Sequence, residues 1–141
     1  LFRHTQKPIG LVMGIPTLRE IFDEKYYTKL DGGFLEAFGR LFKNDLKMYV
    51  YPLLEKETGE LVTVENLTVS RRLRHLYAHL TANRHIVGID RYTTDYLPIF
   101  SREILGKIRK GQSGWEKCLP QKVAQTIKKR RLFGYKPKPR K

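Results

Sequence analysis

Two histidines, His75 and His79, stand four residues apart, which is the spacing that two metal ligands use on one face of a helix. A zinc site of that kind also needs a third ligand, and its catalytic form carries a general-base carboxylate between the histidines. No carboxylate lies between them here, and no third ligand is evident beyond His85. The sequence therefore predicts solvated or phosphate-facing histidines and no metal site.

Arginines gather just before these histidines, at Arg71, Arg72 and Arg74. On a helix in this region, Arg71, Arg74 and His75 share the outer face, with Arg72 on its flank. Cations in the first turn of a helix oppose its dipole, whose N-terminal end is partly positive. An anionic partner would also relieve the repulsion between the arginines. We therefore predict phosphate contacts from these four residues, with a solvated face as the alternative.

Two other features could do chemistry, and we predict none from either. Gly10 and Gly14 flank an apolar stretch that leads into a predicted helix, but the segment 14–16 is too short and stiff to wrap a diphosphate. The single cysteine, Cys118, has no histidine close in sequence to act as its base, so we expect a packed, inert thiol. The residue patterns predict no catalytic residue and no cofactor.

The C-terminus is the most basic part of the chain, with eight lysines and arginines in its last fourteen residues. Phe133 and Tyr135 lie among these cations, and aromatic rings in such a cluster either stack on nucleic-acid bases or anchor the tail to the core. Both roles stay open for both rings. The run 128–131 also has the composition of a nuclear localisation signal. We predict RNA or phosphate contacts from the eight cations of the last fourteen residues: Lys128, Lys129, Arg130, Arg131, Lys136, Lys138, Arg140 and Lys141.

Charge is distributed unevenly along the 141 residues, whose formal net charge is +14. Residues 1–70 contain nine Lys and Arg against ten Asp and Glu, whereas residues 71–141 contain nineteen against four. Such an excess repels itself unless an anionic partner offsets it. The hydrophobic fraction of 40% is enough for a folded core and argues against a disordered chain. No apolar run approaches the roughly 20 residues of a membrane span.

The N-terminal half is predicted to contain both helices and strands. The apolar run 9–15 predicts a strand, and Thr17 with Glu20 forms a capping-box pattern for a helix over 17–29. A second helix is expected from Phe34 to about residue 43. Residues 46–54 and 61–64 read as an antiparallel β-hairpin whose glutamates are solvated.

The C-terminal half is predicted to be mostly helical. A helix over 71–82, capped by Ser70, carries an apolar stripe of Leu73, Leu76, Tyr77 and Leu80. Two more helices are expected, one capped by Ser101 and one with Pro120 at its first position. The predicted fold class is α+β, with about five helices packed with a short antiparallel β-hairpin. We expect a single compact domain over residues 1–135 and a basic extended tail over 136–141.

These patterns favour a non-enzymatic, RNA-binding structural component of a ribonucleoprotein assembly, such as a ribosome, including an organellar one. Its expected partners are nucleic acid, with RNA favoured, and neighbouring proteins. Two alternatives stay open: a domain of a larger enzyme acting on phosphate-bearing substrates, and a DNA-binding module that uses the helix over 71–82. We expect an intracellular protein. The start at Leu1, without methionine, fits a mitochondrial-matrix protein whose leader was removed and equally a piece of a longer chain.

Overall fold

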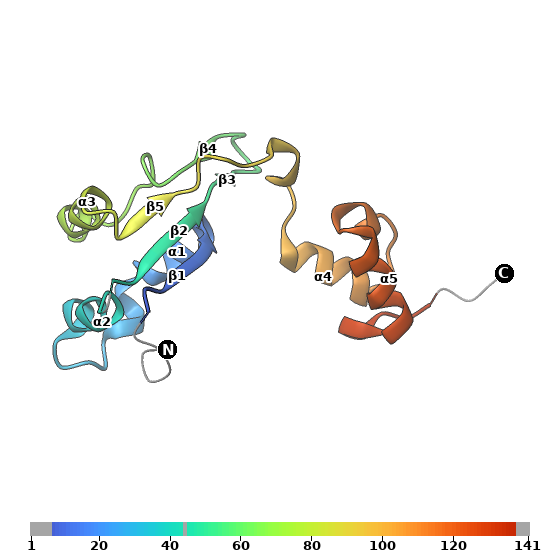
Figure 1. Cartoon of the computed structure of the whole chain (residues 1–141), viewed down its shortest axis with the longest axis horizontal. Helices are drawn as coiled ribbons and strands as arrows, with labels where there is room; N and C mark the ends of the chain where they lie inside the picture. The colour runs from blue at the N-terminus through green and yellow to red at the C-terminus, as the bar shows by residue number, and fades with distance from the viewer. Residues whose placement is uncertain (1–6, 44, 138–141) are drawn as a thin grey trace. The chain divides into compact units, whose positions relative to one another are not determined.

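The computed structural model describes residues 7–43 and 45–137 and has the predicted α+β class. Within these residues, five α-helices accompany a three-stranded parallel sheet and a two-stranded antiparallel pair (Figure 1). The chain divides into two compact units, Leu1–Tyr92 and Thr93–Lys141. The expectation of one domain over residues 1–135 stays a prediction.

The first unit is organised around a parallel sheet of the order β1-β2-β5. Its strands are β1 (Gly10–Gly14), β2 (Lys47–Tyr51) and β5 (Ile86–Gly88). In this register Val12 of β1 lies beside Tyr49 of β2, and Tyr49 lies beside Val87 of β5. The strand predicted over 9–15 is confirmed as β1. It forms here because a short apolar run suits a strand that packs against helices.

Three α-helices accompany this sheet. They are α1 (Ile15–Ile21), α2 (Gly33–Leu41) and α3 (Arg74–Ala82). The ring of Phe22, just after α1, contacts Phe38 of α2 with centroids 5.1 Å apart and Tyr77 of α3 with centroids 5.2 Å apart. Three elements distant in sequence therefore share one aromatic core. Parallel strands need such crossover helices, and the strand order places them on the same side.

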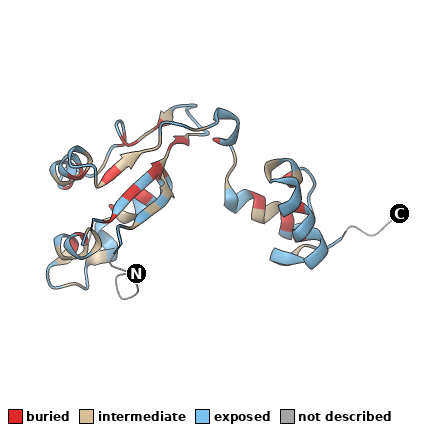
Figure 2. Cartoon of the chain, in the orientation of Figure 1, coloured by how far each residue is buried: buried red, intermediate tan, exposed pale blue. Residues whose placement is uncertain are grey.

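The opposite face of the sheet is open. In β2, Met48 and Val50 are buried, whereas Lys47 and Tyr49 on the other face are exposed (Figure 2). Val12 of the neighbouring β1 is 74% exposed. Sheets made only of parallel strands usually have both faces covered. Within the described residues of the first unit, one face of the sheet is therefore buried, and no layer covers the other face.

The predicted hairpin over 46–54 and 61–64 is wrong in most of its length. The first segment divides at Pro52: residues before it form β2 of the parallel sheet, and β3 (Leu53–Leu54) pairs with β4 (Leu61–Val62). Only this two-residue pair is antiparallel. Proline has no N–H to continue a ladder, so pairing changes partner there.

Two predicted helix starts are also wrong. Helix α1 begins directly after Gly14, and Thr17 lies inside it rather than capping it. The first helix ends at Ile21 and is followed by the 3₁₀ turn η1 (Glu24–Tyr27) instead of continuing to residue 29. Residues before Arg74 form a turn in which the Leu73 N–H donates to the Ser70 carbonyl, so the Ser70 side chain caps nothing.

The second unit is helical. Its elements are η2 (Thr94–Tyr96), α4 (Ser101–Arg109), η3 (Trp115–Cys118), α5 (Gln121–Arg130) and η4 (Leu132–Gly134). The core contains Trp115, which is 1% exposed, surrounded by Ile104 and Ile108 of α4 and Ala124 and Ile127 of α5. The two predicted helices are thus present, but Ser101 is the first residue of α4 rather than its cap, which is Phe100, and Pro120 is the N-cap of α5 rather than its first residue. None of the helices in the described segments has the length and apolar character to cross a membrane.

Candidate nucleic-acid interface

The charge excess belongs mainly to the second unit. Residues 93–141 contain fourteen Lys and Arg against three Asp and Glu, a net charge of +11. Residues 1–92 contain fourteen against eleven, a net charge of +3 in nearly twice the length. Even if every acid of the second unit paired with a cation, eleven cations would remain. The basic surface is therefore a property of this small helical unit.

The C-terminal end of α5 carries the densest group of cations. Lys129 and Arg130 are exposed in its last turn, and Arg131 follows as the C-cap with a left-handed backbone, φ 51°. Cations are favourable at a helix C-terminus, where the carbonyl groups give a partial negative charge. The helix dipole therefore stabilises this cluster in the free protein. We define the α5 cluster as Lys129, Arg130 and Arg131.

Lys128, predicted as a phosphate contact, has a partner within its own unit. Its Nζ lies 2.8 Å from Glu116 Oε1 and 5.6 Å from the centre of the Trp115 ring. The hydrogen bond from Lys128 holds the pKa of the Glu116 carboxyl below its usual value. Lys128 thus joins α5 to η3, and its charge is partly neutralised before any phosphate approaches.

The two aromatic residues of the tail lie in different environments. Tyr135 packs edge-on against Trp115, with ring centroids 5.9 Å apart. Phe133 is 58% exposed and has φ 56°, a left-handed conformation that is uncommon for a bulky residue. The sequence left two roles open for both rings, base stacking and anchoring of the tail, and the two rings differ in which role their position suits. Tyr135 anchors the tail to the core, and Phe133 presents its ring at the surface.

Phe133 lines an open apolar groove of about 390 Å³ in this unit, together with Leu105 of α4 and Val123 of α5. Arg109, which the sequence analysis did not single out, runs beside the same loop. A Cβ on Gly134 would lie 3.6 Å from Arg109 Cγ. The sequence separation of 25 positions between Arg109 and Gly134 hid this proximity, although the charge count of residues 93–141 already includes Arg109. The exposed ring of Phe133 thus lines the groove, and the aliphatic stem of Arg109 lies beside the residue that follows it.

The second predicted group of cations lies in the first unit. Arg71 and Arg72 are exposed in the turn before α3, and Arg74 and His75 are its first two residues. The Arg74 Nε donates a hydrogen bond to His75 Nε2 at 3.0 Å. This bond requires a neutral acceptor nitrogen on the imidazole. Because the helix begins later than predicted, only Arg74 and His75 of the four stand in its first turn.

The remaining predicted contacts belong to the tail. Lys136 is exposed and follows Tyr135 without regular secondary structure. Lys138, Arg140 and Lys141 lie outside the described residues. The predicted basic tail over 136–141 is thus described only for its first two residues.

The other features that the sequence singled out form no catalytic arrangement. No group of three or more His, Cys, Asp or Glu side chains is placed to hold a metal ion in the segments that the structure describes. Helix α1 follows β1 without an intervening loop, which leaves no backbone to wrap a phosphate. The Cys118 thiol is half-buried against the second unit's core and donates weakly to the Gly114 carbonyl at 3.8 Å.

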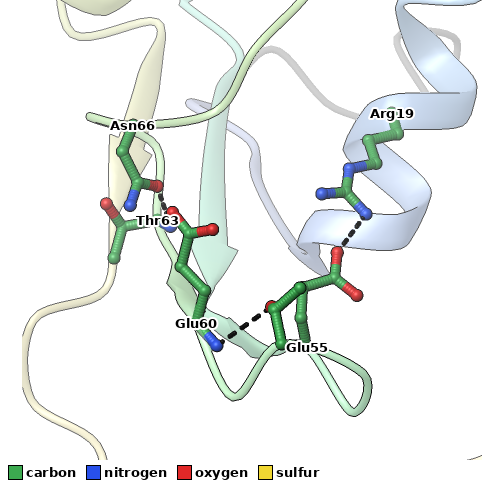
Figure 3. Close-up of polar contacts among 6 residues, drawn as sticks. Arg19, Glu55, Glu60, Thr63 and Asn66 are labelled. Carbon is green, nitrogen blue, oxygen red and sulfur yellow. Dashed lines mark hydrogen bonds and ion pairs between the residues drawn. The ribbon is translucent and has the colours of Figure 1, made fainter.

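The glutamates of the β3–β4 turn have structural contacts. Glu55 Oε1 lies 2.6 Å from Arg19 Nη1 of α1, and the Glu55 N–H donates to the Glu60 carbonyl at 2.9 Å (Figure 3). Asn66 Oδ1 accepts from the Thr63 N–H at 2.7 Å. These contacts fix the turn and the segment after it to the first unit.

Comparisons of the chain with models of protein families, with curated proteins and with solved structures gave no match.

Proposed function

We propose that the chain is an RNA-binding, non-enzymatic component of a ribonucleoprotein assembly, such as a ribosome, and that its second unit makes the RNA contact. The observation that carries the proposal is the charge of that unit, +11 in 49 residues with only three acids. Phosphate neutralisation supplies most of the non-specific affinity of such proteins.

Phe133 adds a contact that favours single-stranded RNA over other polyanions. Its exposed ring lies two residues after Arg131, in the chain that leaves the α5 cluster. Bases stack on exposed aromatic rings with about 1–3 kcal/mol per base, while neighbouring cations meet the backbone. A polyanion without bases would bind through the electrostatic attraction alone, without the stacking contribution.

A salt titration tests the proposal. The probe is a fluorescein-labelled 20-nucleotide oligouridine, and anisotropy is read between 50 and 200 mM salt. We expect steep salt dependence for the wild type. The triple variant Lys129→Gln, Arg130→Gln, Arg131→Gln should reduce the slope by about 2, roughly 0.7 for each lost contact to a single strand. A flat profile for the wild type would overturn the proposal.

A matched control removes the same charge from the first unit. Lys29, Lys43 and Lys47 are exposed there, and replacing all three by Gln also changes the net charge by −3. This control should leave the slope nearly unchanged. An equal loss in both triple variants would show that net charge alone attracts RNA and that the α5 cluster is not its site.

Phe133→Ala separates stacking from charge. Loss of one stacked base weakens oligouridine binding roughly 5- to 150-fold, which corresponds to the 1–3 kcal/mol above. The same variant should bind heparin, which has charge but no bases, as the wild type does. Tighter binding of duplex DNA than of oligouridine by the wild type would favour the DNA-binding alternative.

The parallel sheet favours a second candidate, a domain of an enzyme that acts on phosphate-bearing substrates. Such sheets bind ligands at the carboxyl ends of their strands. A cavity of about 260 Å³ lies there, beyond Val50 of β2 and Gly88 of β5. Its lining includes Glu65 and Asp90, which disfavour a phosphate. Stabilisation of the first unit by ATP or NAD in a thermal-shift titration would support the enzyme; the RNA proposal expects no shift.

A further inference from the structure

We propose that the first unit binds an extended segment of a partner protein as a fourth strand beside β5. The partner has apolar side chains at alternate positions and a Lys or Arg at the Gly88 end of β5. This inference concerns a protein partner and does not rest on the RNA proposal, which assigns RNA to the other unit.

The outer side of β5 has free pairing capacity. Toward β2, the His85 carbonyl accepts from the Met48 N–H at 2.8 Å, and the Ile89 N–H donates to the Val50 carbonyl at 2.9 Å. Backbone groups alternate sides along a strand, so Ile86 and Gly88 direct theirs away from β2. In the part of the chain that the structure describes, no strand pairs with that side. An unpaired strand edge is a template for another strand, and here Ile86 is 2% exposed, so its backbone faces the groove beside the edge rather than the open surface.

A groove runs beside this edge, in the position where the inward side chains of a fourth strand would lie. It measures about 930 Å³ and is lined by β5, by Tyr77 and Ala78 of α3, and by Val64 and Leu67 of the segment after β4. Val64, Leu67 and Tyr77 are buried, and Ala78 is exposed and small. In an added strand, alternate side chains would enter this groove while the backbone pairs with Ile86 and Gly88.

The groove walls are held in place without an occupant. The Tyr77 hydroxyl donates to the Val64 carbonyl at 2.7 Å, which ties α3 to the opposite wall. The Asn66 amide donates to the Leu61 carbonyl at 2.9 Å, and its Oδ1 accepts from Thr63 (Figure 3). Because the groove walls are already ordered, binding of the partner does not include the free-energy cost of ordering them.

Charges at the two ends of the groove give the partner a direction. Glu65 and Asp90 line the end near Gly88, and a Glu65 carboxylate oxygen lies 3.1 Å from the position of a Gly88 Cβ. Arg84 lines the end at the start of β5. A cationic side chain is therefore favoured beside Gly88 and disfavoured beside Arg84. The carboxylates of Glu65 and Asp90 would repel a uniformly acidic strand or a nucleic acid.

The test uses two fluorescein-labelled peptides and the full chain. In Val-Thr-Val-Thr-Val-Thr-Lys the lysine lies on the valine face and reaches Glu65 if the strand is parallel to β5, and in Lys-Thr-Val-Thr-Val-Thr-Val if it is antiparallel. We expect one of them to bind in anisotropy titrations up to 1 mM. The Ile86 and Gly88 amides should then exchange at least tenfold more slowly with solvent. Methylation of alternate peptide nitrogens, which removes the donors, should weaken binding at least tenfold.

Variants on α3 identify the groove. Ala78→Trp fills it from an exposed position and should weaken peptide binding at least tenfold. His79→Trp places the same ring on the neighbouring exposed position, outside the groove lining, and should leave binding unchanged. Both variants should bind oligouridine like the wild type, so failure here is distinct from failure of the RNA proposal.

Three results would overturn the inference. The first is no binding of either peptide at 1 mM, and the second is binding that survives nitrogen methylation or Ala78→Trp. The third is a concentration-dependent dimer in sedimentation that Ala78→Trp abolishes, because the occupant would then be a second copy of this chain.

Discussion

The ring of Tyr135 packs edge-on against the indole of Trp115, with the centroids 5.9 Å apart, although 19 residues separate them in the chain. Trp115 is the only tryptophan, and it is the most buried side chain of the second unit. Its fluorescence therefore reports the unfolding of that unit alone. The contact makes the end of the chain before Lys136 part of the core.

Two shortened chains separate this packing from charge. Ending the chain after Leu132 removes Tyr135, whereas ending it after Tyr135 keeps the ring; both lose Lys136, Lys138, Arg140 and Lys141. We expect the first to lower the stability of the second unit by at least about 1 kcal/mol and the second to leave it unchanged. Thermal unfolding followed by Trp115 fluorescence measures this. Equal midpoints would contradict the assigned role of Tyr135.

The stability of the first unit should fall between pH 10 and pH 12 because of Tyr77. Burial, with a smaller effect of the Glu65 charge, raises the pKa of Tyr77 to about 12, from 10.0. In this window the unfolded chain loses the phenolic proton while the folded chain keeps it, so rising pH favours unfolding. A shift of two units corresponds to about 2–3 kcal/mol. Urea unfolding followed by circular dichroism at pH 9 to 12 measures the loss.

Tyr77→Phe provides the control for this dependence. It removes the ionisable hydroxyl, and with it the alkaline loss that Tyr77 causes. It also leaves the Val64 carbonyl without its donor, so we expect a cost of about 1–3 kcal/mol at pH 7. Tyr49→Phe, at an exposed position, should retain the wild-type alkaline loss. The prediction fails if Tyr77→Phe loses stability with pH as steeply as the wild type.

Leu80→Ala tests the inner face of α3. Leu80 is 5% exposed, so its truncation leaves a cavity and should cost about 2–5 kcal/mol. Leu35 on α2 is 70% exposed, and Leu35→Ala should change the free energy of unfolding little. Leu76, which the sequence placed on the same stripe, is only half-buried, and its truncation should cost less than that of Leu80. Equal costs for Leu80 and Leu35 in urea unfolding would show that α3 packs through another face.

The Glu116–Lys128 pair predicts a titration shift rather than a large stability effect. The hydrogen bond from Lys128 lowers the pKa of Glu116, so the pair stabilises the fold above the unfolded carboxyl pKa and loses that effect as pH falls through the folded value. Both groups are partly exposed, and such pairs contribute little. An NMR titration should show Glu116 titrating below its usual range, and Lys128→Gln should raise its pKa. An unchanged pKa in the variant would argue against the pair in solution.

Local patterns predicted the elements whose formation depends on neighbouring residues. The apolar run of β1, the stripe Phe34 to Leu41 of α2 and the apolar positions Ala124 and Ile127 of α5 all gave correct elements. The alternation around Met48 and Val50 also correctly indicated a strand. Such patterns report which face of an element is buried, because each side chain's burial depends on the period of its own element.

The same patterns do not identify the partners of an element. Residues 46–51 alternate equally well whether they pair with the nearby segment 61–64 or with β1 and β5. The short loop favoured the hairpin, whereas packing of Phe22, Phe38 and Tyr77 on one face favours the parallel arrangement. The starts of α1 and α3 were missed for a related reason, since their N-cap residues, Gly14 and Leu73, make no side-chain cap for the sequence to reveal.

By itself, the sequence determined the charge of the second unit and the presence of two aromatic rings near its end, because composition does not depend on folding. Only the tertiary structure decided that Tyr135 faces Trp115 while Phe133 faces solvent. The left-handed backbone at Arg131 and Phe133 turns the chain after α5, and only one of the two rings then points to the core. Which ring is buried depends on this turn and on a tryptophan 20 positions earlier in the chain, and no local pattern of residues encodes that contact.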